Sequence, residues 1–89
     1  MVHIYAVRLS GGTGHQHITQ VRWKNPDTDK TGENSRAEMV NWIKNEGGKA
    51  YVCGGGHLAP VRVVDSDPPY LRTYADGVWT DNLLALPRF

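Results

Sequence analysis

Apolar residues recur at strand spacing near the start of the chain. The segment from His3 to Leu9 is rich in β-branched and aromatic residues and is bounded by glycine, which predicts a strand. Both of its faces are at least half apolar: Ile4, Ala6 and Arg8 on one, and His3, Tyr5, Val7 and Leu9 on the other. Since a strand wetted on one face alternates more cleanly, this indicates either a central place in the sheet or a second face that meets a partner. A second strand, His17 to Trp23, follows the flexible segment SGGTG, so the two are predicted to form a hairpin.

Apolar spacing then changes to the helical period. The run NPDTDKTGEN at 25–34 consists of turn residues throughout. Ser35 and Glu38 follow it with the spacing of a capping box, in which the Ser35 hydroxyl accepts from the Glu38 N–H and the Glu38 carboxylate reaches back to the Ser35 N–H. The apolar residues of the next segment lie within one helical arc: Met39, Val40, Trp42 and Ile43. We therefore predict a helix that runs to about Glu46 and ends at Gly47 and Gly48 in a left-handed cap.

The remainder of the chain returns to short strands. Lys49–Cys53 and Val61–Asp65 flank the glycine turn at 54–57 as a second hairpin, and Tyr70–Tyr74 is a last strand before the turn at 75–77. The tail TDNLLALPRF is apolar enough to pack back onto the body. The element order is β-β-α-β-β-β, which predicts an α+β fold with one helix on a face of an antiparallel sheet of four to five strands. Residues 1–89 are expected to form a single domain.

Composition narrows the class of protein. The single cysteine, Cys53, allows no internal disulfide, which fits a reducing compartment. There is no signal-peptide pattern at the N-terminus and no apolar run of the ~20 residues that a bilayer span needs, so we expect a cytoplasmic protein. Ten basic and nine acidic residues leave a net charge of +1, which disfavours binding through nucleic-acid phosphates. Three tryptophans and four tyrosines supply large buried areas for a small core.

The C-terminal third carries a family resemblance. The string YLRTYADGVWTDNLLALPRF at 70–89 resembles the hallmark of the domain-of-unknown-function family 3892, a set of small bacterial and bacteriophage proteins. The elements that match are Tyr70-Leu71-Arg72-Thr73, Asp76-Gly77, Asp81-Asn82-Leu83 and Leu86-Pro87. HITQVRW at 17–23 and the helix ending in Gly47-Gly48 are also similar, while GGTGHQHI and NPDTDKTGENS look like segments of actinobacterial or actinophage members. The resemblance implies a fold but no activity, cofactor or partner.

The polar residues of this motif are the candidate ligand or partner contacts: Arg72, Thr73, Asp76, Asp81 and Asn82. An arginine fork beside Asp and Asn side chains would bind an anion or a peptide end. In the structural interpretation, which we favour, Asp76-Gly77 is a turn pair, Asp81 or Asn82 closes the next turn, and Arg72 pairs with one of the two aspartates.

Two patterns suggest metal ions, and both are weak. His15 and His17 would share one side of a strand, with His3, His57 and Cys53 as further ligands, but zinc sites usually show two close ligand pairs. The loop from Asp27 to Glu38 follows part of an EF-hand frame, yet it has Thr31 at the fifth position and Asn34 at the eighth, a strand precedes it, and the capping box claims Glu38. We expect no metal and no cofactor.

Catalytic signatures are also weak. SGGTG and CGGGH lack the lysine and the following helix of a phosphate-binding loop, so both are interpreted as turns. Cys53 alternates with Tyr51 as a strand residue and has no evident base, and Asp65 and Asp67 flank a turn. We therefore expect a protein that is not an enzyme.

The sequence establishes no function for the chain, and we expect a non-enzymatic protein-interaction module that self-associates. The apolarity of both faces of the first strand and the small core motivate this expectation. One alternative is a nucleic-acid-associated accessory domain, in which aromatics stack bases beside the basic residues Arg8, Arg22, Lys24, Arg62 and Arg72. Another is a phage-encoded inhibitor of a host protein. In the purely structural interpretation, the aliphatic parts of these basic side chains cover the edge of an aromatic core.

Overall fold

The computed structural model describes residues 1–54, 57–75 and 77–89. Its strands are β1 (Val2–Leu9), β2 (Ile18–Lys24), β3 (Thr31–Ser35), β4 (Ala50–Gly54), β5 (His57–Val64), β6 (Tyr70–Ala75) and β7 (Val78–Thr80). The helix α1 spans Arg36–Asn45, and a 3-10 turn, η1, spans His15–His17. Within the described ranges no helix has the length and apolarity that a bilayer span would need.

The strands form one sheet in the order β3-β2-β1-β4-β5-β6-β7, so the α+β class is correct. Over the described residues the sheet has seven strands, which corrects the expectation of four to five. It is also not purely antiparallel, because β1 and β4 pair in parallel through Val2–Ala50 and His3–Tyr51. The two strands that the sequence did not reveal, β3 and β7, are the edges of the sheet. Residues 31–34, assigned to turns, belong to β3 and pair with β2 instead.

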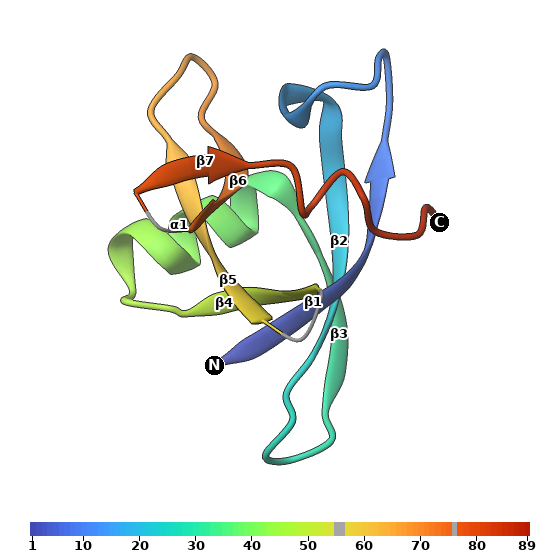
Figure 1. The fold of residues 1–89 in the computed structure, drawn as a ribbon, viewed down its shortest axis with the longest axis vertical. Coiled ribbons are helices and arrows are strands. Elements are labelled where there is room, and N and C mark those ends of the chain that lie inside the picture. The colour runs from blue at the N-terminus through green and yellow to red at the C-terminus, as the bar shows by residue number, and fades with distance from the viewer. Residues whose placement is uncertain (55–56, 76) are drawn as a thin grey trace.

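The sheet curves until its far end approaches β1. β5 pairs with β4 through residues 57–60 and with β6 through residues 61–64. Beyond β7 the tail reaches β1, where the Val7 N–H donates to the Pro87 carbonyl (3.0 Å) and the Phe89 N–H donates to the Val7 carbonyl (3.2 Å). Figure 1 shows β1 to β3 on one side, β5 to β7 on the other, and the tail crossing between them.

The apolarity of both faces of β1 has a local cause. The register with β2 shifts between Ile4 and Ala6, so a bulge at Tyr5 changes which side chains face the core. As a result Ile4 and Val7, an odd number of positions apart, are both in the core, while Tyr5 is 45% exposed. β1 also lies between β2 and β4. It therefore has the central place in the sheet that was one of the two explanations for its apolar faces. The pattern that motivated a partner for β1 is therefore explained within the chain.

The helix begins and ends as predicted. Ser35 accepts from the Glu38 N–H (3.2 Å) and the Glu38 carboxylate accepts from the Ser35 N–H (2.9 Å). At the other end Gly47 has a φ of +68°, and the Gly48 N–H donates to the Trp42 carbonyl (2.9 Å). Met39 and Val40 are buried against the sheet, and Trp42 and Ile43 pack at the edge of the core.

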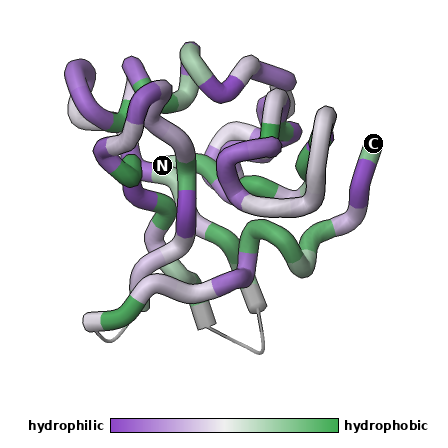
Figure 2. Tube along the Cα trace, turned by 90° about the horizontal axis from the view of Figure 1, so that it is seen from above, coloured by the Kyte–Doolittle hydropathy of each residue, from purple (hydrophilic) through white to green (hydrophobic). Residues whose placement is uncertain are grey.

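The C-terminal tail completes the core, as its apolar sequence predicted. Leu83 is fully buried, and Leu84 and Leu86 pack against the cluster of buried residues. Figure 2 shows the chain before the C-terminus as a mostly hydrophobic run with a hydrophilic stretch close to its end. The burial of these leucines holds the tail against the body of the molecule, between the end of β7 and β1.

Candidate functional site

The motif residues of β6 meet the end of β7. Arg72 donates from Nε to the Thr80 carbonyl (3.2 Å) and from Nη2 to Oδ1 of Asp81 (3.0 Å), where it forms an ion pair. Thr73 is fully buried, its hydroxyl donates to the Thr80 carbonyl (3.2 Å), and it lies 2.6 Å from the Thr80 hydroxyl. Both side chains therefore connect the same two strands, which is the geometry expected for the structural interpretation.

The other motif residues contribute less to this cluster. The Asp81 carbonyl accepts from the Ala85 N–H (3.2 Å), which closes a helical turn after β7, and Asn82 is half-buried in that turn. Asp76 lies outside the described residues, whereas Gly77, the second residue of the predicted turn pair, has a φ of +81°. Of the two aspartates proposed as partners of Arg72, the structure pairs Arg72 with Asp81.

A residue outside the motif joins this pair. His15, in η1, is 7% exposed, and its Nε2 lies 3.8 Å from Oδ1 of Asp81. In the described part of the chain this nitrogen is buried without a hydrogen-bond partner. Burial lowers the pKa of His15 below its usual value; the charge of Arg72 acts in the same direction, and that of Asp81 opposes them. His15 is thus held neutral beside an ion pair.

The predicted histidine pair is not arranged as a metal site. His15 and His17 lie in the 3-10 turn η1 and not on a strand, and Nδ1 of His17 accepts from the Gly14 N–H (3.1 Å). Among the described residues no three His, Cys, Asp or Glu side chains gather as a metal site would require.

The EF-hand frame is not formed either. Thr31 to Ser35 is the strand β3, paired along its length with β2, and Glu38 is bound to Ser35 in the capping box. The central glycines of CGGGH, 55 and 56, lie outside the described residues.

The basic residues on the strands make contacts within the chain. The guanidinium groups of Arg8 and Arg22 lie 4.7 and 4.1 Å from the centre of the Phe89 ring, and Arg22 also pairs with Glu33 (3.1 Å). The guanidinium of Arg62 lies 4.9 Å from the centre of the Tyr74 ring. Lys24 lies 3.5 Å from a carboxylate oxygen of Asp29. These contacts support the interpretation in which basic stems cover aromatic surfaces.

The outer face of the sheet carries a row of three aromatic residues and one proline that the sequence did not reveal. Tyr51 opposes Pro60 across β4 and β5, and Tyr74 opposes Trp79 across β6 and β7. The register of Val61 with Thr73 places Pro60 beside Tyr74, so the four side chains cross four strands in one line. We call this row, Tyr51, Pro60, Tyr74 and Trp79, the aromatic row. The sequence signal of Tyr51, Pro60 and Tyr74 is the strand period, because each lies next to a buried residue; Trp79 has no such signal, since its neighbour Val78 is 59% exposed.

A second candidate site is a cavity beside the helix α1. A cavity of about 530 Å³ lies between α1 and the hairpin of β2 and β3. Two indoles, two carboxylates and one ammonium group line it: Trp23, Trp42, Glu38, Glu46 and Lys30. We call it the indole pocket. Trp23 donates from Nε1 to Oδ1 of Asn34 (2.7 Å), which fixes its ring at the β3 side. The sequence signal was the spacing of Glu38, Trp42 and Glu46 four residues apart on one helix face.

Comparison with known proteins assigns the chain to a family. No curated protein matches it. No solved structure matches it. The model of the family described as "Protein of unknown function (DUF3892)" matches residues 3–87, nearly the whole chain, and the protein therefore belongs to this family.

Proposed function

We propose that the protein is a non-enzymatic interaction module that pairs with a second copy of itself through β7. The observation that carries the proposal is the composition of this sheet edge. Val78 is 59% exposed and Trp79 is 42% exposed on a strand that pairs with β6 on one side only. Exposed apolar edge strands are templates for pairing with another chain.

The opposite edge of the same sheet is protected. β3 has the sequence TGENS, and its Glu33 carboxylate pairs with Arg22. Charged residues on an edge strand oppose pairing with another chain, and β7 has none; its polar residue, Thr80, is hydrogen-bonded to Thr73 of β6. This difference between two edges of one sheet favours β7 as the surface where copies meet.

Pairing of β7 with itself would be antiparallel about a two-fold axis, so each copy would use the same surface. Trp79 is the middle residue of the strand and packs on Tyr74 with ring centroids 5.0 Å apart at 76°. The aromatic row of one copy would then continue into that of the other. A continuous aromatic surface of this kind is suited to bind a further protein, since tyrosine and tryptophan dominate binding hot spots.

The proposal is tested by the oligomeric state of two matched variants. Val78→Lys places a charge on the β7 edge, and Thr31→Lys places the same charge on β3, where the residue is also exposed. Sedimentation equilibrium is expected to show a dimer for the unmodified chain and for Thr31→Lys, and a monomer for Val78→Lys. A chain that stays monomeric at its highest soluble concentration, or a Val78→Lys variant that dimerises unchanged, contradicts self-association.

The alternative of a nucleic-acid-associated domain has one supporting observation. Arg62 lies over Tyr74 within the aromatic row, and aromatics beside arginine can stack bases. Its neighbour Arg72, however, forms an ion pair with Asp81, and the net charge of the chain is only +1, which disfavours binding to phosphates. A salt-dependent mobility shift with a single-stranded oligonucleotide, lost in Arg62→Ala, would favour this alternative over the protein interface. Binding to one host protein through the β7 edge, without a dimer, would instead favour an inhibitor.

A further inference from the structure

The indole pocket has the size of a small-ligand site. Its volume of about 530 Å³ falls in the range of roughly 300–1,000 Å³ that ligand pockets occupy. Val2 and Met39, both part of the core cluster, line it together with the two indoles. Ligand pockets typically combine an apolar lining of this kind with a few polar groups.

Each indole of the pocket lies close to a glycine. A Cβ atom on Gly48 would fall against the Trp42 ring, and a Cβ atom on Gly32 would fall against the Trp23 ring. Gly32 opposes Trp23 in the β2–β3 register, so the ring lies over the β3 backbone. The absence of side chains at these two positions lets both rings lie close to the backbone and border one cavity.

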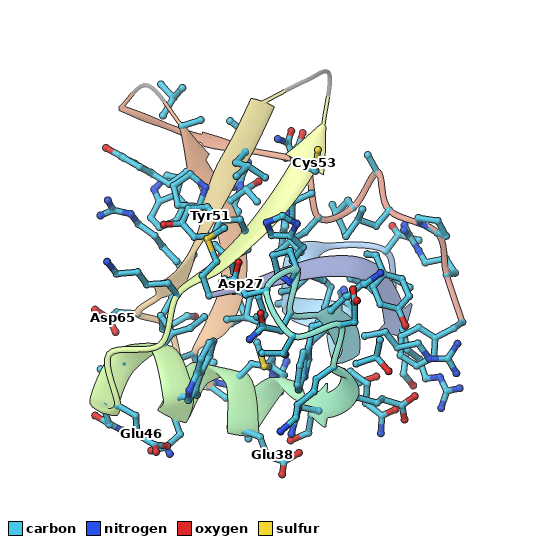
Figure 3. All side chains as sticks on the ribbon, turned by 90° about the horizontal axis from the view of Figure 1, so that it is seen from below. Asp27, Glu38, Glu46, Tyr51, Cys53 and Asp65 are labelled. Atoms are coloured by element: carbon cyan, nitrogen blue, oxygen red, sulfur yellow. The ribbon has the colours of Figure 1, made fainter. Side chains whose placement is uncertain are left out.

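The charges that line the pocket are mainly negative. Glu38 and Glu46 each contribute a carboxylate, whereas Lys30 contributes the single ammonium group among the described lining residues. Hydrogen bonds from Ser35 lower the pKa of Glu38, which keeps it ionised at neutral pH. Figure 3 shows Glu38 and Glu46 on one side of α1, near its two ends. Trp42 lies midway between them in the sequence, one helical turn from each, so the helix face presents a carboxylate on either side of an indole.

We propose that the indole pocket binds an organic cation of the alkylammonium class. Aromatic faces attract such cations through the ring quadrupole, and tryptophan does so most strongly. The two carboxylates supply charge complementarity, and the apolar floor suits the alkyl groups. An anionic ligand would meet repulsion from both glutamates, and a neutral ligand would gain nothing from them. The site does not depend on the pairing of β7, so its test is separate from that of the proposed function.

The probe is choline, compared with its neutral isostere 3,3-dimethylbutan-1-ol. Binding is followed by NMR on the indole N–H resonances of Trp23 and Trp42, with Trp79, which lies outside the pocket, as the internal control. Choline is expected to shift the first two resonances with saturation and to bind ~3-fold or more tightly than the isostere, because only choline carries the charge. Nα-acetyl-lysine methylamide then distinguishes a primary from a quaternary ammonium.

Three charge variants give the sign of the effect. Glu46→Gln removes a carboxylate from the pocket and is expected to weaken choline binding by ~3-fold, the size of one charge interaction at a solvated site. Lys30→Gln removes the resident positive charge and is expected to strengthen binding by a similar factor. Glu33→Gln, at a carboxylate outside the pocket, is expected to leave the affinity unchanged.

Several outcomes would overturn the proposal. Equal binding of choline and its isostere would show that the pocket does not recognise charge. Equal effects of Glu33→Gln and Glu46→Gln would place any binding outside the pocket, as would shifts confined to Trp79. All the substituted residues are solvent-exposed, so the folded fraction of each variant can be verified from the dispersion of the same spectra.

Discussion

Arg72 and Asp81 form an ion pair of 3.0 Å that connects β6 to the turn after β7. The same arginine donates to the Thr80 carbonyl, so removing its side chain costs both contacts. We expect Arg72→Ala to lower the free energy of unfolding by about 1 kcal/mol, since the pair is partly exposed and solvent screens it. Arg62→Ala is the comparison, because Arg62 opposes Arg72 on β5, is exposed, and loses a contact with the Tyr74 ring but no ion pair among the described residues. Urea denaturation measures both, and equal losses would contradict a specific role for the pair.

The buried His15 predicts a dependence of stability on pH. Its pKa is lowered in the folded state, mainly by burial, so the unfolded chain takes up its proton at a higher pH. Stability is therefore fully present above the pKa of an unfolded-chain histidine and is lost as the pH falls below it toward the lowered folded value. The slope for this one proton cannot exceed about 1.4 kcal/mol per pH unit.

The measurement is a series of urea titrations across this pH window. His15→Gln is expected to flatten the dependence, whereas His17→Gln, at a half-buried histidine, is expected to retain it. A slope that His15→Gln leaves unchanged would place the proton uptake on another residue.

The close approach of Gly48 to Trp42 predicts a steric effect. A methyl group there would overlap the indole, so Gly48→Ala is expected to destabilise the fold by about 2 kcal/mol, as overpacking does, and to change the Trp42 fluorescence. Gly47→Ala would meet no atom within 4 Å but would strain a φ of +68°, and should cost about 1 kcal/mol without the spectral change. In a Trp42→Ala background the cost of Gly48→Ala should largely disappear. A cost that persists there would point to the backbone of the helix end.

The buried tail predicts that Leu83 supports the whole domain. Leu83→Ala is expected to lower the free energy of unfolding by about 3 kcal/mol, because the side chain is fully buried and leaves a cavity. Leu84→Ala makes the same substitution at a partly buried neighbour and should cost clearly less. Thermal unfolding compares the two, and a small effect of Leu83→Ala would show that the tail is dispensable.

The features that could be predicted from sequence are those whose chemistry is local. Ser35, Glu38 and Gly47 act within one turn of α1, so the start and end of the helix follow from residue identity alone. The buried positions of β4 and β6 alternate with less buried ones and could be recognised by their period, whereas the buried residues of β2, Ile18 and Val21, are three positions apart. The edge strands could not be recognised in this way, because β3 is almost entirely polar and β7 has three residues.

The candidate sites show the same division. The sequence identified Asp81 as one possible partner of Arg72, and the structure shows these two residues as an ion pair. The sequence did not indicate that His15 lies beside this pair, because its position depends on how η1 packs against β6. Trp42, predicted to lie on the apolar arc of the helix, packs at the edge of the core and also borders a cavity whose other wall comes from a different hairpin.

By itself the sequence determined the helix with both of its ends, the alternation in β4 and β6, the apolar tail and the family. Tertiary structure alone decided the bulge at Tyr5, the parallel pairing of β1 with β4, the edge position of β3 and the cavity that Trp23 and Trp42 both line. The physical reason is the range of the interactions. A cap or a period is a free-energy preference among neighbours in the chain, while register, edges and pockets depend on which distant segments compete for the same hydrogen bonds and the same core.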